Sequence, residues 1–396
     1  MMNTRPTDVA VAGHICLDII PRFPEGVGKT IEEIMRPGKL VNVEEAAIST
    51  GGPVSNTGIA LTILGMSVDF MAQVGDDYFG EAIISRLKKS GHSEGVKIAK
   101  GQNSSYTIAI APPGIDRIFL HNPGTNNTFT CDSVDANLVK NAKLFHLGYP
   151  PLMRGLYSND GEELVKTFRK AKEAGATTSL DMSLPDPTTE SGRVNWDLVL
   201  KRTLPYVDIF LPSIEEALFM FEKDRFIELK KQTNGAEVLN LLKGSDYTRL
   251  AEVSLSYGAR IAALKSAHRG FYMKTGSKEK LAAMGPAQPG DMDNWVDREL
   301  WCPAYHVPKI ASATGSGDSS IAGFLNAYLR GESIERTLQF ANCVGYQNLF
   351  ELDALSGIKT WEETVAMVEG NLPQNELDPE TAGWNWDSSW RIWIKA

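Results

Sequence analysis

The sequence predicts an α/β protein with a doubly wound, mostly parallel sheet flanked by helices. Short apolar runs at 8–13, 144–148 and 177–181 end at glycine or an acid, which is typical of buried strands. Helical patterns such as 161–174 lie between them, and this alternation favours parallel βαβ units. A chain of 396 residues can form one large α/β domain or two domains.

Composition narrows the function classes. The net charge of −9 argues against a nucleic-acid surface, which needs lysine and arginine to neutralise phosphates. The cysteines at 16, 131, 302 and 343 are scattered and form no CxxC pair, so neither a zinc site nor a disulfide framework is indicated. The N-terminus lacks a charged region followed by an apolar stretch, and no segment resembles a transmembrane helix. We therefore expect a cytoplasmic, reduced protein with no membrane or nucleic-acid partner.

The most informative stretch is the small-residue turn at 311–317, which precedes a predicted helix. Gly315 and Gly317 allow a sharp turn and close approach of backbone N–H groups to a ligand. Those N–H groups and the positive end of the helix form a site for anions. Asp318 cannot itself bind phosphate, but a carboxylate beside a phosphate site suits a general base that deprotonates an attacking hydroxyl. Asp318 could equally be a helix cap.

Three further candidate residues lie in the N-terminal part of the chain. Asp18 follows the first predicted strand, at the edge where open α/β sheets bind ligands, although it could also be an exposed loop acid. Gly52 and Asn56 belong to a turn that opens the next helix. The double glycine at 51–52 permits close approach of a ligand, and the Asn56 amide can donate to and accept from a hydroxyl.

Two stretches carry a family resemblance. The sequence Thr314-Gly315-Ser316-Gly317-Asp318 resembles the C-terminal signature of the ribokinase-like carbohydrate kinases, the PfkB family, and residues 51–91 resemble the N-terminal signature. The resemblance spans roughly 8–370 and implies a ribokinase-like fold with a small β lid. It implies that Asp318 is the catalytic base and that Gly315, Ser316 and Gly317 form the anion hole.

The same resemblance implies the remaining site residues. Acceptor contacts are expected at Asp18, Gly52, Asn56 and, less specifically, Asn126, and nucleotide contacts at Lys265, Gly270 and Asn342. Glu216 would organise Mg²⁺ through water, although a helix-start glutamate is ordinarily a cap.

The chain also departs from the family pattern. Ser213 stands where asparagine is usual, and Ala267 stands where a glycine is usual. Asp181-Met182-Ser183 departs from Asp-x-Asn, which leaves the role of Asp181 open. Ser312 and Ala313 replace an Asp-Thr pair that helps to bind K⁺ in many relatives.

The predicted organisation is one kinase domain over 1–382 followed by a tryptophan-rich tail over 383–396. The lid is expected from about 15–50 and 96–122, with insertions at about 222–245 and 276–302. The tail holds four of the eight tryptophans, so it must bury itself against its own domain or a partner. Lid strands in the family often pair between subunits, which makes a homodimer one expected state.

These features predict an ATP-dependent phosphotransferase that phosphorylates a hydroxyl of a small sugar or related polyol, with ATP and Mg²⁺ bound. A nucleoside kinase of the same fold and a non-catalytic sugar-binding sensor remain alternatives, and retention of Asp318 counts against the sensor. A nicotinamide dehydrogenase is disfavoured because no Gly-x-Gly-x-x-Gly follows the first strand, and a Walker-type ATPase lacks its Gly-x4-Gly-Lys motif.

Overall fold

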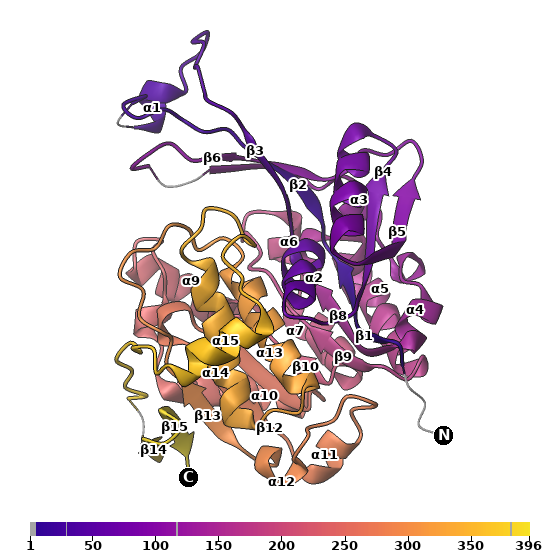
Figure 1. The fold of residues 1–396 in the computed structure, drawn as a ribbon, viewed down its shortest axis with the longest axis vertical. Coiled ribbons are helices and arrows are strands. Elements are labelled where there is room, and N and C mark those ends of the chain that lie inside the picture. The colour runs from indigo at the N-terminus through magenta and orange to yellow at the C-terminus, as the bar shows by residue number, and fades with distance from the viewer. Residues whose placement is uncertain (1–4, 29, 116–117, 381) are drawn as a thin grey trace.

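A large central sheet and a smaller second sheet organise the protein (Figure 1). The structure is a computed structural model that describes residues 5–28, 30–115, 118–380 and 382–396. The central sheet has the strand order β14-β15-β13-β12-β11-β10-β9-β8-β1-β4-β5. Its strands are β1 (Thr7–Gly13), β4 (Val68–Gly75), β5 (His92–Ala99), β8 (Ala142–Gly148), β9 (Thr177–Leu180), β10 (Ile209–Phe210), β11 (Ile261–Lys265), β12 (Phe271–Thr275), β13 (Glu299–Cys302), β14 (Trp384–Asp387) and β15 (Ile392–Lys395).

The sheet is parallel from β5 to β11 and antiparallel from β11 to β14. Strand β1 lies between β4 and β8, with Val9 opposite both Val68 and Leu144. Both faces of β1 are buried, because Val9 and Val11 enter one core cluster while Ala10 and Ala12 enter the other. This explains its continuous apolar sequence, which is typical of a parallel strand covered on both faces. The predicted doubly wound, mostly parallel sheet is confirmed.

Helices cover both faces of this sheet. One face packs against α4 (Ala136–Asn141), α5 (Arg154–Glu173), α7 (Trp196–Thr203), α8 (Ile214–Phe221), α9 (Lys223–Gln232) and α10 (Gly244–Ser256). The other packs against α2 (Pro53–Ile63), α3 (Tyr78–Ser90), α11 (Lys278–Ala282), α12 (Met292–Trp295), α13 (Ser316–Leu329) and α14 (Ile334–Asn348). The short α6 (Glu190–Arg193) and the outer α15 (Trp361–Glu369) complete these layers. In the described ranges, no helix has the length and apolar character needed to cross a bilayer.

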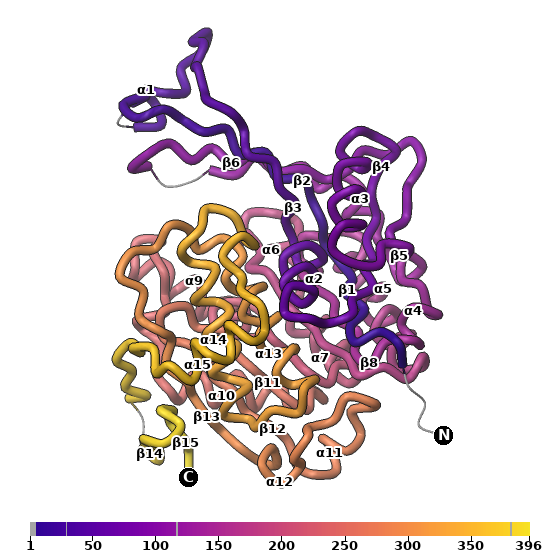
Figure 2. The backbone as a smooth tube through the Cα atoms, viewed as in Figure 1, coloured from indigo at the N-terminus to yellow at the C-terminus, as the bar shows by residue number. Residues whose placement is uncertain are grey.

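The smaller sheet forms the lid and stands away from the helical layers at the top of Figure 1. Its order is β3-β2-β6-β7, from β2 (Cys16–Ile20), β3 (Ala47–Gly51), β6 (Tyr106–Ile110) and β7 (Ile118–Asn122). The β2–β3 and β6–β7 pairs are antiparallel, whereas β2 and β6 run parallel. Figure 2 shows the segment between β2 and β3, with α1 (Ile31–Ile34), projecting beyond the lid. Residues 96–99, expected at the edge of the lid, belong instead to β5 of the central sheet.

The tryptophan-rich tail forms the β14–β15 hairpin and continues the central sheet at β13. The Trp384 ring lies 6.1 Å from the Tyr272 ring and 6.2 Å from the Trp301 ring, centroid to centroid. These aromatic contacts and the backbone ladder attach the tail to the domain body rather than leaving it as a separate unit.

Candidate active site

The glycine turn lies between the end of β13 and α13. Gly315 adopts a left-handed conformation with φ of 77°, and a Cβ atom there would lie 2.4 Å from the Ala354 Cβ. The turn therefore requires glycine for both its dihedral angle and its close packing. Of the three predicted anion-hole donors, the Ser316 N–H already donates to the Ala313 carbonyl at 3.3 Å. In the described part of the chain, the N–H groups of Gly315 and Gly317 have no backbone acceptor of this kind, which leaves them as the better donors.

Asp318 is buried in the first turn of α13, with 1% of its surface exposed. Its Oδ2 accepts hydrogen bonds from Asn56 Nδ2 at 2.8 Å and from the Tyr149 hydroxyl at 3.0 Å, and Thr57 lies 3.4 Å from Oδ1. Burial raises the pKa of Asp318, while the Asn56 hydrogen bond and the charge of Lys265 oppose that rise. A carboxylate with a raised pKa accepts a proton more readily at neutral pH, as a general base requires.

Tyr149, which sequence reasoning missed, contacts the predicted base. It follows β8 directly and adopts a left-handed backbone conformation, with φ of 64° and ψ of 41°. Such a conformation costs roughly 1–3 kcal/mol for a residue other than glycine, and strain of this kind concentrates at functional sites. Burial raises the pKa of Tyr149, so its hydroxyl remains a donor to Asp318. Its position at the carboxyl end of a central strand was the available sequence signal.

Lys265, Asp181 and Glu216 form a second group of charged side chains, in which Asp181 is buried and the other two are half-buried. The Lys265 amine bonds to Asp181 and donates to the Leu211 carbonyl at 2.7 Å. Burial alone would lower the pKa of Lys265, but Asp181 and Glu216 raise it, so the amine stays charged. A Cβ atom added to Gly317 would lie 3.5 Å from Lys265 Cε, so this lysine lies beside the glycine turn. Asp181, whose role the sequence left open, is thus the ion-pair partner of Lys265.

Glu216 forms a capping box with Ser213 at the start of α8. Its Oε2 accepts from the Ser213 N–H at 2.6 Å, and its own N–H donates to Ser213 Oγ at 3.1 Å. Burial raises the pKa of Glu216, partly offset by the charge of Lys265. Glu216 therefore caps the helix with one carboxylate oxygen, Oε2. Glu216 is also the residue expected to organise Mg²⁺.

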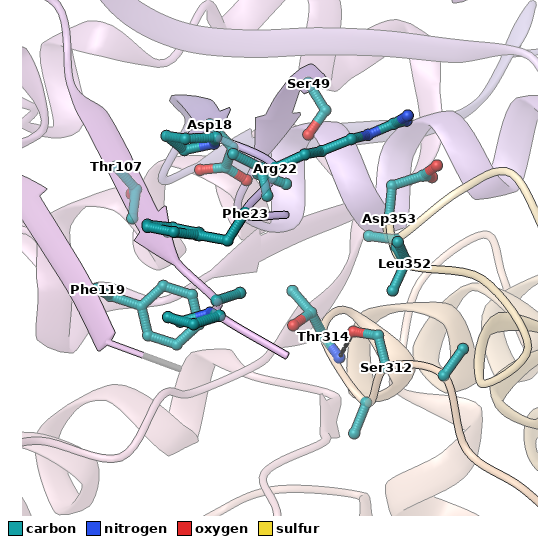
Figure 3. A pocket seen from close by; sticks show the side chains of 18 of the residues that line it. Asp18, Arg22, Phe23, Ser49, Thr107, Phe119, Ser312, Thr314, Leu352 and Asp353 are labelled. Carbon is teal, nitrogen blue, oxygen red and sulfur yellow. Dashed lines mark hydrogen bonds between the residues drawn. The ribbon is translucent and has the colours of Figure 1, made fainter. Parts of the chain in front are cut away.

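Of the expected acceptor residues, Asp18 lines a cavity of about 650 Å³ between the lid and the glycine turn (Figure 3). Asp18 and Thr107 line it from the lid, and Ser312 and Thr314 line it from the turn. Burial raises the pKa of Asp18. A Cβ atom added at Gly51 would lie 2.3 Å from Asp18 Oδ2, so the neighbouring glycine leaves room for this carboxylate.

Gly52 is the N-cap of α2 and Asn56 lies in its first turn, and neither lines this cavity. Gly52 caps the helix with φ of 86°, and a Cβ atom there would lie 2.5 Å from His14 Nδ1. The His14 side chain is buried, and burial lowers the pKa of His14 to about 3. Neither ring nitrogen of His14 nor Asn56 Oδ1 has a hydrogen-bond partner within the described residues. These buried polar atoms can receive groups of a ligand.

The acceptor contact expected of Asn126 stays a prediction, and its side chain also has a structural role. Its side chain is fully buried in a 3₁₀ turn (Gly124–Thr128), where Oδ1 accepts from Ile15 N at 3.3 Å and Nδ2 donates to Ile15 O at 2.9 Å. Both ends of the amide are used by the backbone that joins β1 to β2. Asn126 therefore holds the segment that carries Asp18.

A second cavity of about 520 Å³ lies on the other side of the turn. Its lining includes the predicted nucleotide residues Lys265, Gly270 and Asn342, together with Gly317. Asn342 Nδ2 donates to the carbonyls of Cys302 at 3.0 Å and Pro303 at 3.1 Å, so its amide supports the cavity wall. A Cβ atom added at Gly270 would lie 2.1 Å from the Cys302 carbonyl oxygen, so this glycine allows the same wall to pack closely.

The two cavities meet at the glycine turn, since Ile310 and Ala313 line both. One is bounded by hydroxyl and carboxylate groups of the lid, and the other by the Lys265–Gly270 turn and α14. The buried carboxylate of Asp318 lies in the first turn of the helix that follows, one residue beyond Gly317, and itself lines neither cavity. This arrangement can hold two substrates with their reacting groups at one anion-binding turn.

Comparison with known proteins identifies the family. Residues 7–282 and 297–369 match the model of the pfkB family carbohydrate kinases. The chain is 31% identical over 370 residues to fructokinase-2 of Solanum lycopersicum, covering 90% of this chain and 95% of the relative.

Two solved structures share the fold. The Arabidopsis thaliana ribokinase complexed with ribose and ATP has a TM-score of 0.65 at 15% identity, covering 92% of this chain and 99% of the other. An E. coli protein described as ribokinase II, in complex with ATP and Mg²⁺, has a TM-score of 0.65 at 18% identity, covering 92% and 100%. The chain belongs to the pfkB family and is an ATP-dependent carbohydrate kinase with a ribokinase-like fold.

Proposed function

We propose that the enzyme transfers the γ-phosphoryl group of ATP to a hydroxyl of a small sugar or related polyol. The observation that carries this proposal is the junction of the two cavities at the glycine turn, next to the buried carboxylate of Asp318. The fructokinase and ribokinase names of similar proteins support a sugar as acceptor.

Asp318 would accept the hydroxyl proton as that oxygen bonds to the γ-phosphorus and the bond to ADP breaks. The N–H groups of Gly315 and Gly317 would stabilise the negative charge of the transferring group, with a smaller part for Ser316 because of its bond to Ala313. Lys265 would add a positive charge beside Gly317. Asp18 and Asn56 would orient the acceptor through its other hydroxyls.

The charge of the acceptor cavity favours a neutral sugar. Its described lining holds three carboxylates, Asp18, Glu44 and Asp353, and one guanidinium, Arg22. Figure 3 shows Arg22 in the cavity with Asp18 and Asp353. A phosphorylated sugar would bring two further negative charges into this surplus of carboxylates, at a cost in binding free energy.

The side chains of the site are compatible with a Mg²⁺ ion whose ligands are mostly phosphate oxygens and waters. Among the described residues, no group of three or more His, Cys, Asp or Glu side chains is placed to hold a metal ion. Mg²⁺ commonly uses only one or two carboxylates together with substrate phosphates and waters. Glu216, near the single positive charge of Lys265, is the carboxylate we assign to that role. Bound Mg²⁺ would supply neutralisation of phosphate charge.

The cysteines and the edges of the lid sheet bear on the location and oligomeric state of the protein. All four cysteines are free thiols, which suits a reducing compartment such as the cytoplasm. Strands β3 and β7 are the two edges of the lid sheet and can pair with a second lid, so we propose a homodimer. Light scattering on the purified protein measures this directly, and a monomer at micromolar concentration would contradict it.

A substrate panel tests the proposed function. ATP consumption is measured with fructose, ribose, other neutral sugars and nucleosides, each with and without Mg²⁺. We expect the highest kcat/KM with a neutral sugar and dependence on Mg²⁺. A preference for nucleosides would support the nucleoside kinase, and sugar binding by calorimetry with no turnover would support a sensor; either result contradicts the proposal.

A further inference from the structure

A C-terminal segment outside the family match forms part of the second cavity. The family match ends at residue 369, and residues 372–377 then run alongside 303–306. Asn375 N donates to the Ala304 carbonyl at 2.8 Å, and His306 N donates to the Pro373 carbonyl at 2.8 Å. Ala304, His306 and Asn375 all line the cavity that contains Lys265 and Gly317. The segment is therefore an outer wall of the proposed nucleotide site.

The tail hairpin fixes this segment at both ends. Arg391 Nη2 donates to the Leu372 carbonyl at 3.0 Å, and Trp393 Nε1 donates to the Leu377 carbonyl at 3.0 Å. The hairpin itself is paired with β13, which leads directly into the 303–306 wall. In Figure 1 the yellow hairpin and β13 lie together near the C-terminus. The wall segment is thus held on a sheet rather than on a loose terminus.

The side chain of Asn375 connects two loops of the cavity. Its Nδ2 donates to the His268 carbonyl at 2.9 Å, and its Oδ1 lies 3.1 Å from His306 Nδ1. A carbonyl can only accept, so the orientation of the amide is fixed with Nδ2 toward His268. Oδ1 can likewise only accept, so the proton of the neutral His306 ring must sit on Nδ1. The ring nitrogen left for a ligand, Nε2, is then an acceptor.

We propose that Asn375 is a positioning residue that holds His306 as a hydrogen-bond acceptor for the exocyclic amino group of adenine. This inference rests on the proposed use of ATP. Adenine carries an amino donor at its 6-position, whereas guanine carries a carbonyl acceptor there. An acceptor at His306 Nε2 can receive a hydrogen bond from the adenine amino group. The same nitrogen would face the guanine carbonyl as one acceptor against another, without a hydrogen bond. The segment 372–377 thereby gives the enzyme its preference for adenine over guanine nucleotides.

Equilibrium binding tests this independently of turnover. Calorimetry measures the dissociation constants of Mg²⁺–ADP and Mg²⁺–GDP for the full-length protein at pH 8. The wild type should bind ADP more tightly than GDP by roughly tenfold or more, the effect of one matched against one mismatched hydrogen bond. His306→Phe keeps a ring of similar size but removes the acceptor, and Asn375→Leu removes the group that fixes it. Both variants should bring the ADP-to-GDP affinity ratio close to one.

Gln374→Leu is the matched control. Gln374 also anchors the segment, donating to the Pro303 carbonyl at 3.3 Å, and among the hydrogen bonds of the described residues none joins its side chain to His306. Its substitution should leave the affinity ratio unchanged even if both affinities fall. Equal binding of ADP and GDP by the wild type, or an unchanged ratio in His306→Phe, would overturn the inference. A normal ratio in a protein that phosphorylates no sugar would support the inference while contradicting the proposed function.

Discussion

The hydroxyl of Tyr149 should set the pH at which the proposed base becomes active. It donates to Asp318 Oδ2 at 3.0 Å, and this bond favours the ionised carboxylate. Tyr149→Phe removes the donor and leaves the ring in place. The pKa of Asp318, which burial already raises, should therefore rise further.

The contacts of Asp318 limit how far its pKa can rise in this variant. A hydrogen bond to a charged group contributes about 1.5–3 kcal/mol, and one pKa unit corresponds to about 1.4 kcal/mol. Asn56 donates to the same oxygen at 2.8 Å and remains in the variant, so the lower end of the range applies. We expect the pKa of Asp318 to rise by about one unit.

The assay is kcat/KM for the best sugar as a function of pH at saturating Mg²⁺–ATP. Because the base must be ionised, the acid limb of the profile should move up by about one pH unit in Tyr149→Phe, while the alkaline plateau changes less. Tyr257→Phe is the control, since the Tyr257 hydroxyl makes an equivalent bond of 2.8 Å to Asp197 on another part of the protein. It should leave the acid limb in place.

An unmoved acid limb with a lowered plateau in Tyr149→Phe would show that this hydroxyl does not control the pKa of Asp318. Tyr149 would then contribute to the shape of the acceptor site and not to the ionisation of Asp318.

Three further predictions concern the metal, the monovalent cation and stability. If Glu216 organises Mg²⁺, Glu216→Gln should raise the Mg²⁺ concentration needed for the half-maximal rate. An unchanged Mg²⁺ concentration would mean that Glu216 serves only as the helix cap that it forms with Ser213. Ser312 replaces an acid expected near a K⁺ site, and one charge pair at about 4 Å is worth about 4 kcal/mol at an effective dielectric of about 20. Replacing K⁺ by a large organic cation should therefore change the rate little, and steep activation at low millimolar K⁺ would contradict this. Burial raises the pKa of Asp318 in the folded state, so its ionisation lowers the stability of the folded protein at pH values above the unfolded pKa of about 3.9. Asp318→Asn should therefore raise Tm at pH 8, and the difference in Tm between variant and wild type should disappear as the pH falls toward 4. An equal or lower Tm at pH 8 would argue against it.

The local parts of this site were predictable from the sequence. The turn before α13 needs glycine for its dihedral angle and its packing, and the two glycines in the sequence indicate such a turn. The continuous apolar residues of β1 likewise indicate a buried strand. The ribokinase-like fold followed from the order of such segments.

The long-range contacts were not predictable from local pattern. Asn56 and Asp318 are 262 residues apart, and only the packing of α2 beside α13 brings their side chains together. Tyr149 looks like an ordinary aromatic residue after a strand until its left-handed backbone turns its hydroxyl to Asp318. The burial of Asn126 against Ile15 likewise depends on how a distant turn packs on the lid connection. Neither periodicity nor propensity encodes these pairings.

We propose Asp318 as the general base of a sugar kinase, and removal of its negative charge is the sharpest test of that role. Asp318→Asn keeps an acceptor for the Asn56 donor but cannot take up the hydroxyl proton. Its kcat with the best sugar should fall by roughly 10²–10⁴, the usual contribution of a positioned base, while calorimetry should show nearly unchanged binding of Mg²⁺–ADP. Near-normal turnover in this variant would rule out Asp318 as the base.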